Sequence, residues 1–126
     1  LASLLEAARW AASCFNAQPW HLVVARRDRE PAAHAAICEC LSGNNQAWAP
    51  QAPVLMVSIA RLDFAHNGRP NRHAAYDTGA AMAQMAIQAA ALGLQIHQMG
   101  GFDLDKARET LGIPEGHEPR AAIALG

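Results

Sequence analysis

Two short segments carry groups that could bind a ligand. The first, residues 13–20 (Ser-Cys-Phe-Asn-Ala-Gln-Pro-Trp), places small hydrogen-bonding side chains among aromatic residues. Such a loop can hold the edge of a polar, planar molecule. The second, Gly100-Gly101, follows a strand-like run. Glycines there let the backbone approach a ligand closely, with amide N–H groups free to donate. Either segment taken alone is also typical of an ordinary turn.

A metal site is the first chemistry to consider. His34, Cys38 and Cys40 lie close together, but only His34 and Cys38 share a helical face. A zinc site needs about four converging ligands, and there is no second cysteine pair. We therefore interpret these residues as core or helix-surface side chains and expect no bound metal.

Nucleophilic catalysis is the second chemistry to consider. Ser13 and Cys14 lie beside a predicted helix end, and His21 is near in sequence. A reactive cysteine needs a cationic or helix N-terminal environment. Cys14 instead follows a helix C-terminus, where the dipole disfavours a thiolate. No paired carboxylates share a face and no Gly-rich phosphate loop with lysine is present, so we assign no catalytic side chain.

One long helix is expected to organise the chain. Residues 74–94 are rich in helix-forming Ala, Met, Leu and Gln and contain no proline. In a helix, Asp77, Gln84 and Gln88 fall on one narrow strip, and the remaining circumference is apolar or small. This pattern predicts a helix that is buried on most sides.

A row of small residues follows the same helix. Gly79, Ala83, Ala86 and Ala90 recur at helical spacing and would let another backbone approach closely. We interpret this row as a possible subunit contact. An ordinary core helix without a partner chain is the alternative.

Shorter helices and strands alternate around this helix. Helices are predicted over residues 1–12, 31–41 and 104–111, with Asp103 as an N-cap and a helical turn over 46–49. Strands are predicted over 20–26, 54–60, 94–99 and 121–125. Residues 64–72 are the most polar stretch and are expected to form an exposed loop. The alternation predicts a sheet covered by helices on both faces.

Composition predicts a single domain over residues 1–126. Of the 126 residues, 52% are hydrophobic and 17% are charged, the net charge is -1, and Lys106 is the only lysine. Basic residues are not clustered, so no nucleic-acid partner is expected. Polar residues interrupt the long helix, so no membrane span is expected. Three cysteines without a secretory signal suggest the reducing cytoplasm. Because the chain starts at Leu1 inside a helical pattern and stops at Gly126, we expect truncation at both ends.

Residues 7–20 resemble a family signature. They read Ala-Ala-Arg-Trp-Ala-Ala-Ser-Cys-Phe-Asn-Ala-Gln-Pro-Trp, similar to the Ala-Arg-Trp-Ala-Pro-Ser-Ser-x-Asn-x-Gln-Pro-Trp signature of the nitroreductase family. Residues 43–54, 76–79 and 88–94 resemble the following helix, strand and central helix, and residues 100–102 fall where the family has its flavin-edge turn. The resemblance covers essentially the whole chain. It implies an α+β fold with three layers (α/β/α), a central mixed sheet and a long central helix.

The resemblance also implies a site for FMN at the interface of a homodimer. Ser13, Cys14 and Asn16 would contact the flavin of the partner subunit, and Gln18 and Pro19 would complete the loop. The second half of the site would consist of Asn45, facing the pyrimidine side, and the N–H groups of Gly100 and Gly101, near N5 and O4.

Departures from the family pattern lie within the same segments. Ala12 replaces the usual Pro, and Cys14 replaces the usual second Ser. Gly100 stands where some members carry Glu, and Trp48 where some carry a Lys to the ring. The family's basic residues for the FMN phosphate come from an upstream Arg-Arg-Ser segment and a downstream basic pair, neither within residues 1–126.

The activity implied by the resemblance is electron transfer from NAD(P)H through FMN to a nitroaromatic, quinone or similar small acceptor. The alternatives are a flavin-binding module without turnover, and a dimerising domain that has lost a competent flavin site.

Overall fold

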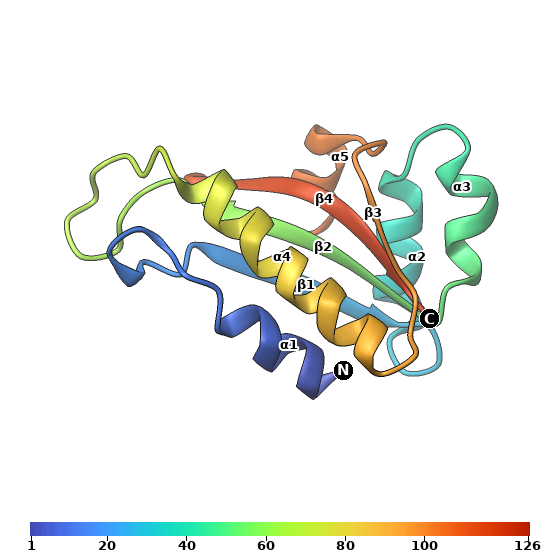
Figure 1. Ribbon diagram of the computed structural model, residues 1–126. Coiled ribbons are helices and arrows are strands. Elements are labelled where there is room, and N and C mark those ends of the chain that lie inside the picture. The colour runs from blue at the N-terminus through green and yellow to red at the C-terminus, as the bar shows by residue number, and fades with distance from the viewer.

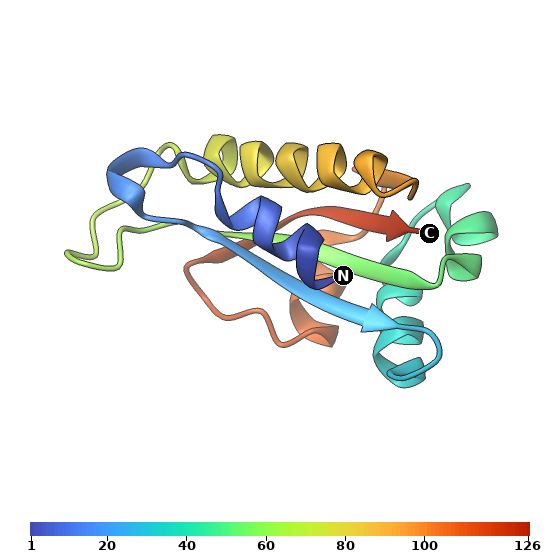
Figure 2. The ribbon, with the colours of Figure 1, turned by 60° about the horizontal axis from the view of Figure 1, so that its bottom comes forward.

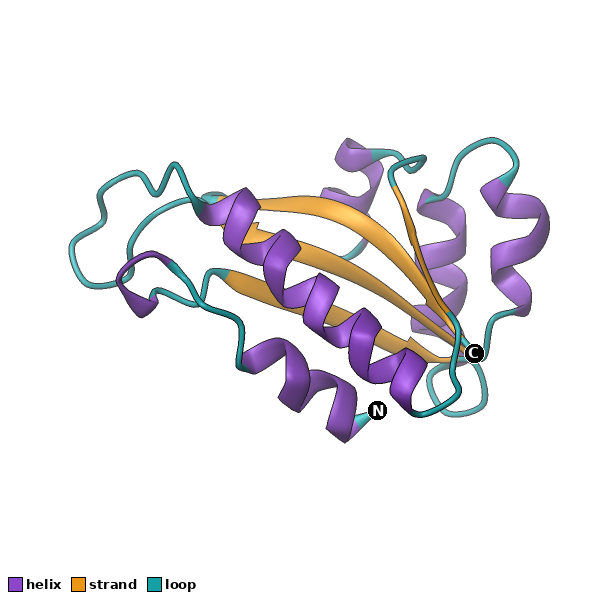
Figure 3. Cartoon of the chain, in the orientation of Figure 1, coloured by secondary structure: helices purple, strands orange, loops and turns teal.

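The computed structural model describes all 126 residues. A four-stranded sheet lies between two layers of helices (Figures 1 and 3). No helix is both long enough and apolar enough to cross a membrane. In chain order the elements are α1 (Ala2–Arg9), η1 (Cys14–Asn16), β1 (Trp20–Arg26), α2 (Pro31–Cys40), α3 (Asn45–Trp48), η2 (Ala49–Gln51), β2 (Val54–Arg61), α4 (Ala74–Ala91), β3 (Ile96–Met99), α5 (Leu104–Thr110) and β4 (His117–Leu125).

The sheet has the strand order β1-β2-β4-β3, and every neighbouring pair is antiparallel. The prediction of a mixed sheet is therefore wrong for the strands of this chain. The direction of β2 has a local cause. The segment containing α2 and α3 returns to the end of the sheet where β1 stops, because the Arg27 N–H donates to the Pro53 carbonyl at 2.9 Å. Starting from that end, β2 has to run back along β1, with Arg26 paired with Val54.

Helices cover both faces of the sheet, as the α/β/α prediction required, and Figure 2 separates the two layers. On one face α1 and α4 pack against the sheet through apolar side chains that include Leu4, Met82 and Met85, all at most 1% exposed. The other face carries α2 and α5 with a second apolar cluster. Residues 55–60 of β2 are all buried, because this strand lies between both layers.

One side of α4 differs from the prediction that the helix is buried on most sides. Tyr76 and Ile87 are 79% and 71% exposed, and the small residues Gly79, Ala83 and Ala90 are exposed beside them. The strip predicted to be polar faces inward instead: Asp77 is buried, and the Gln88 side chain donates to Ser3 Oγ on α1 at 2.9 Å. The exposed side of α4 is thus mostly apolar and small.

Candidate functional site

The loop between α1 and β1 has an unusual backbone. Phe15, Asn16 and Gln18 have φ values of 52°, 53° and 47°, although none is glycine. A left-handed non-glycine residue costs on the order of 1–3 kcal/mol and persists only where its surroundings fix it. Inside the loop, Ser13 Oγ accepts a hydrogen bond from the Gln18 N–H at 3.0 Å. The predicted loop thus forms, in a conformation that the sequence did not reveal.

Three residues outside the loop hold it in place. The Cys14 N–H donates to Asp77 Oδ2 at 2.9 Å, which joins the loop to the first turn of α4. The Phe15 ring meets Phe64 edge to face, with centroids 5.8 Å apart, which joins the loop to segment 64–72, exposed over residues 65–70. The other end of the loop is fixed at the sheet, where the Pro19 carbonyl accepts from the Arg61 N–H at 2.8 Å.

The loop presents free hydrogen-bonding groups. Asn16 and Gln18 are exposed, and their side-chain amides make no hydrogen bond within the chain. Pro19 is fully buried and anchors the loop at the start of β1. Five predicted site residues are therefore brought together on one side of the molecule; they are Ser13, Cys14, Asn16, Gln18 and Pro19.

The turn after β3 joins the other three predicted residues. Asn45 Nδ2 donates to the Gly101 carbonyl at 3.0 Å, and the Ser42 N–H donates to the same oxygen at 3.1 Å. The N–H groups of Gly100 and Gly101 have no hydrogen-bond partner in the chain, and both glycines are exposed. A Cβ at Gly100 would have nothing within 4 Å. The turn therefore offers two free donors in open space.

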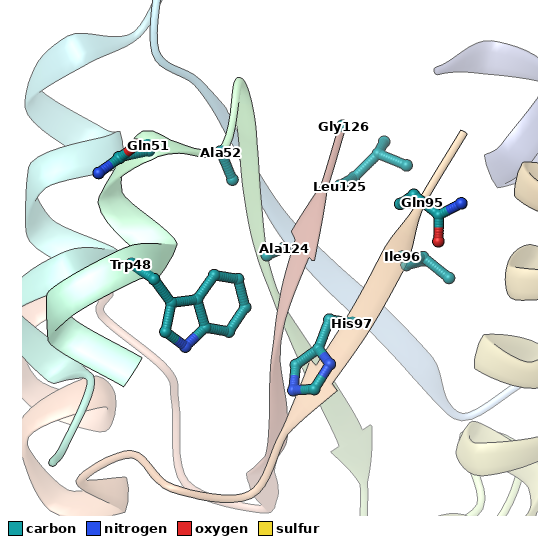
Figure 4. Close-up of a pocket in the computed structure, with 9 residues that line it drawn as sticks. All are labelled: Trp48, Gln51, Ala52, Gln95, Ile96, His97, Ala124, Leu125 and Gly126. Atoms are coloured by element: carbon teal, nitrogen blue, oxygen red, sulfur yellow. The ribbon is translucent and has the colours of Figure 1, made fainter. Parts of the chain in front are cut away.

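A groove opens between α3 and the ends of β3 and β4 (Figure 4). Its volume is about 550 Å³, within the range usual for small-molecule and cofactor pockets. The ring of Trp48 faces His97 edge to face across it, with centroids 5.2 Å apart. Trp48 lies on the same short helix as Asn45, so the groove and the glycine turn are neighbours. No Lys or Arg lines the groove; its lining is Trp48, Gln51, Ala52, Gln95, Ile96, His97, Ala124, Leu125 and Gly126.

The two groups of predicted residues do not meet within one chain. The loop leads into β1 and the glycine turn follows β3, and these strands form the opposite edges of the sheet. Three strand spacings, about 14 Å in total, separate the two edges. Figure 1 shows the loop and the turn on opposite sides of the molecule. One chain therefore holds two separate groups of ligand-binding candidates.

The residues considered for metal binding have partners within the core. The His34 ring donates from Nε2 to the Ala52 carbonyl at 3.0 Å, and its Nδ1 faces Cys38 Sγ at 3.7 Å. Cys40 Sγ donates to the Ala36 carbonyl at 3.2 Å. Burial raises the pKa of both thiols. His34 and Cys40 are buried, and Cys38 is half-buried beside His34.

His21 does not pair with Cys14. Its ring packs against His117, with centroids 5.2 Å apart. Burial is the main factor that lowers the His21 pKa, followed by the positive charges of His117 and Arg61. The structure therefore provides no cysteine–histidine pair at the loop.

Sequence reasoning missed some of the residues that shape these two sites. Asp77 was assigned to a polar strip, and no pattern linked it to Cys14, which is 63 positions away. Ser42 precedes Asn45 by three residues, a spacing that brings both to one turn and could have been noticed. Phe64 contributes an aromatic contact that its sequence neighbours do not indicate.

Comparison with known proteins adds independent evidence. A 15.4 kDa protein of Mycolicibacterium smegmatis is 40% identical over 84 residues, which make up 67% of this chain and 54% of that protein. A Thermus thermophilus protein named NADH dehydrogenase is 33% identical, over 100% of this chain and 74% of that protein. A crystal structure described as an oxidoreductase containing FMN is 39% identical with a TM-score of 0.92, over 99% of this chain and 64% of that chain.

The chain covers only part of the length of these relatives. The chain spans about half of the first relative and less than two thirds of the protein in the crystal structure. The sequence also matches the Nitroreductase family model over residues 1–126. With its three-layer fold and its match over the entire length, the chain belongs to the nitroreductase family.

Proposed function

We propose that the protein is an FMN-dependent oxidoreductase that works as a homodimer in the cytoplasm. One observation carries the proposal: free hydrogen-bonding groups are concentrated at both edges of the sheet, on segments too far apart to hold one ring together. A second copy would bring its own loop to the glycine turn of the first. The apolar, small-residue side of α4 offers a surface for that contact.

Each predicted residue then has a role in holding the flavin. The N–H groups of Gly100 and Gly101, which are unpaired within the chain, would donate to the N5 and O4 region of the ring. Asn45, which donates to the Gly101 carbonyl, would face the pyrimidine side. Ser13, Cys14 and Asn16 approach from the partner loop, which Gln18 and Pro19 complete. FMN, when bound, supplies the hydride and electron chemistry, and the protein supplies binding, orientation and electrostatics. Amide donors in a fixed position stabilise negative charge that develops near them.

The described residues fit the ring of FMN better than its phosphate. The groove beside the glycine turn is lined by aromatic and apolar side chains together with Gln51, Gln95 and His97, and by no Lys or Arg. Phosphate is held best by Arg or Lys side chains. We therefore assign ring-binding residues in this chain and no phosphate-binding residue.

The electron donor and acceptor complete the proposal. NAD(P)H is the proposed donor, which the name of the Thermus thermophilus relative supports. A nitroaromatic, quinone or similar small molecule is the proposed acceptor. Segment 64–72 touches the loop through Phe64 and Phe15 and is exposed over residues 65–70, so it is placed to influence which acceptor is used.

The test uses the purified full-length protein. We expect a yellow, dimeric protein that oxidises NAD(P)H when a nitroaromatic or quinone is added. Gly101→Trp should remove the flavin by filling the turn and leave the dimer intact. Bound FMN without turnover for any acceptor would instead indicate a flavin-binding module, and a dimer that fails to bind added FMN would indicate a site that has been lost. Either result would contradict the proposed activity.

A further inference from the structure

Residues 13–18, the part of the loop before its anchor at Pro19, have a single polar connection to the rest of the protein. Among all hydrogen bonds of residues 13–18, only the bond from the Cys14 N–H to Asp77 Oδ2 leaves the loop. The other hydrogen bonds of these residues stay within the segment. Since the loop contains three left-handed non-glycine residues, its conformation needs an external constraint. Asp77 is the polar group that supplies one.

Asp77 lies in a place where a buried carboxylate is tolerated. Its side chain is 5% exposed and sits in the first turn of α4, which is 18 residues long. The N-terminal end of a helix favours negative charge. A hydrogen bond from a backbone N–H to an ionised oxygen is also stronger than one between neutral groups. The Asp77 side chain thus lies at the start of the helix, within hydrogen-bond distance of the Cys14 N–H.

The neighbouring residue shows that burial at this turn does not by itself create such a bond. Thr78 is 1% exposed, and its Oγ1 has no hydrogen-bond partner. The two residues are adjacent on the same helix and equally enclosed, but only Asp77 reaches the loop. Thr78 therefore provides a matched control for substitution at this turn.

We propose that Asp77 is the positioning residue of the flavin-binding loop. It fixes the backbone at Cys14 and so sets where the loop presents its polar groups to the ring. It also joins that loop to α4, the helix whose exposed side is the proposed subunit contact. The effect on flavin binding rests on the proposed function. The hydrogen bond between Asp77 and Cys14 does not, because it can be measured without a ligand.

The experiment compares Asp77→Ala, Asp77→Asn and Thr78→Val in the full-length protein. Asp77→Ala should raise the Kd for FMN at least tenfold and change the visible circular dichroism of the FMN that still binds at saturation. Asp77→Asn keeps an oxygen that can accept from Cys14, so it should stay within about threefold of the wild-type Kd. Thr78→Val should bind FMN as the wild type does.

Hydrogen exchange at the Cys14 amide tests the anchor directly. Asp77→Ala should speed exchange of that amide at least tenfold, and Asp77→Asn and Thr78→Val should not. A wild-type protein that binds no FMN but shows this pattern would contradict the proposed function and support the anchor. The anchor would be overturned if the Cys14 amide exchanged at the wild-type rate in Asp77→Ala. It would also be overturned if Thr78→Val or Asp77→Asn sped exchange of that amide as much as Asp77→Ala does. A wild-type Kd and flavin spectrum in Asp77→Ala would overturn the positioning role.

Discussion

Gly101 has no room for a Cβ, although Gly100 beside it has. A Cβ at Gly101 would lie 2.8 Å from Asn45 Nδ2 and 3.4 Å from Ser42 Oγ, whereas one at Gly100 would meet nothing within 4 Å. Neither residue has a left-handed backbone. The requirement for glycine is therefore steric and concerns Gly101 alone. The sequence shows two equal glycines, and only the fold distinguishes them.

Alanine at the two positions should have opposite effects on stability. Gly101→Ala pushes the Asn45 amide away from the Gly101 carbonyl and should lower the free energy of unfolding by about 0.5–1.5 kcal/mol, the net value of one hydrogen bond. Gly100→Ala should be neutral or stabilising by up to about 1 kcal/mol, because it only reduces the freedom of the unfolded chain. Urea denaturation of both variants measures the difference. Equal midpoints would contradict the steric account.

Asp103 gives a second prediction at this scale. Its Oδ1 accepts from the Lys106 N–H at 2.9 Å and caps α5. Asp103→Ala should lower the free energy of unfolding by about 1 kcal/mol. Asp105→Ala, in the same turn but without a capping bond, should lose only about 0.3–1 kcal/mol through the helix dipole. Thermal unfolding of the pair is the measurement, and a larger loss for Asp105→Ala would count against the cap.

The range of an interaction explains which residue roles could be predicted. The cap at Asp103 was predicted because donor and acceptor lie three positions apart. The partner of Asp77 lies 63 positions away, and its choice depends on how α4 meets the loop. The left-handed backbone of Phe15 escaped prediction because bulky residues rarely adopt it, whereas Asn is enriched in that region, so Asn16 could have been suspected.

At the scale of elements, β1 was predicted with the bounds it has, because its apolar run ends at charged residues. The last strand was predicted to start four residues too late. Proline argues against a strand because it has no N–H to donate to a neighbouring strand. Pro119 is tolerated in β4 because it lies beside an irregularity in the β2–β4 register, at Ser58/Ile59, and because β3 does not extend far enough to pair with it. The mixed sheet was an expectation from the family, and the pairing within this chain is antiparallel throughout.

The junction of β1 and α2 should respond to acid. Hydrogen bonds from the Arg26 side chain and backbone lower the Glu30 pKa to about 2. A carboxyl group with a lowered pKa stabilises the fold above its unfolded pKa, near 4.5, and loses that effect as the pH falls toward 2. The stability difference between the wild type and Glu30→Gln should therefore be present at pH 7 and vanish near pH 2.

Urea denaturation across this pH range measures the effect. Arg26→Gln removes the same ion pair, whose nitrogen and oxygen are 2.9 Å apart, and serves as the control. In that background the effect of Glu30→Gln should be smaller but not zero, because Glu30 Oε2 still accepts from the backbone N–H of residue 26 at 3.0 Å. A difference between wild type and Glu30→Gln that stays constant from pH 7 to pH 2 would show that the pair does not set the pKa.

At the scale of the whole molecule, the proposed dimer forms through α4. It brings the loop at one sheet edge of one subunit to the glycine turn at the other sheet edge of its partner. Its exposed side carries Tyr76, Ile87 and the row of small residues. Those residues could be read from the sequence, because helical spacing places them together. Their exposure could not, since an apolar helix face packs equally well against its own chain or another.

A charge on this face should separate the subunits. Ala83→Glu places a carboxylate on the exposed side of α4 and should give a folded monomer by light scattering, with a Kd for FMN raised at least tenfold. Ala35→Glu makes the same change at an exposed alanine of α2, in the opposite layer, and should leave both properties unchanged. An Ala83→Glu dimer with wild-type affinity for FMN would contradict the proposed interface.

The position of β4 has a consequence for the nascent chain. This strand is made after the other three, yet it occupies an interior place in the sheet, and Ser58 of β2 bonds Ala121 of β4 across 63 positions. Pairings so distant in sequence form slowly. Until β4 leaves the ribosome, the apolar β2 has one open edge that can pair with a neighbouring polypeptide. Synthesis at high density should therefore favour aggregation, and slower translation or a chaperone that shields β2 should raise the soluble yield.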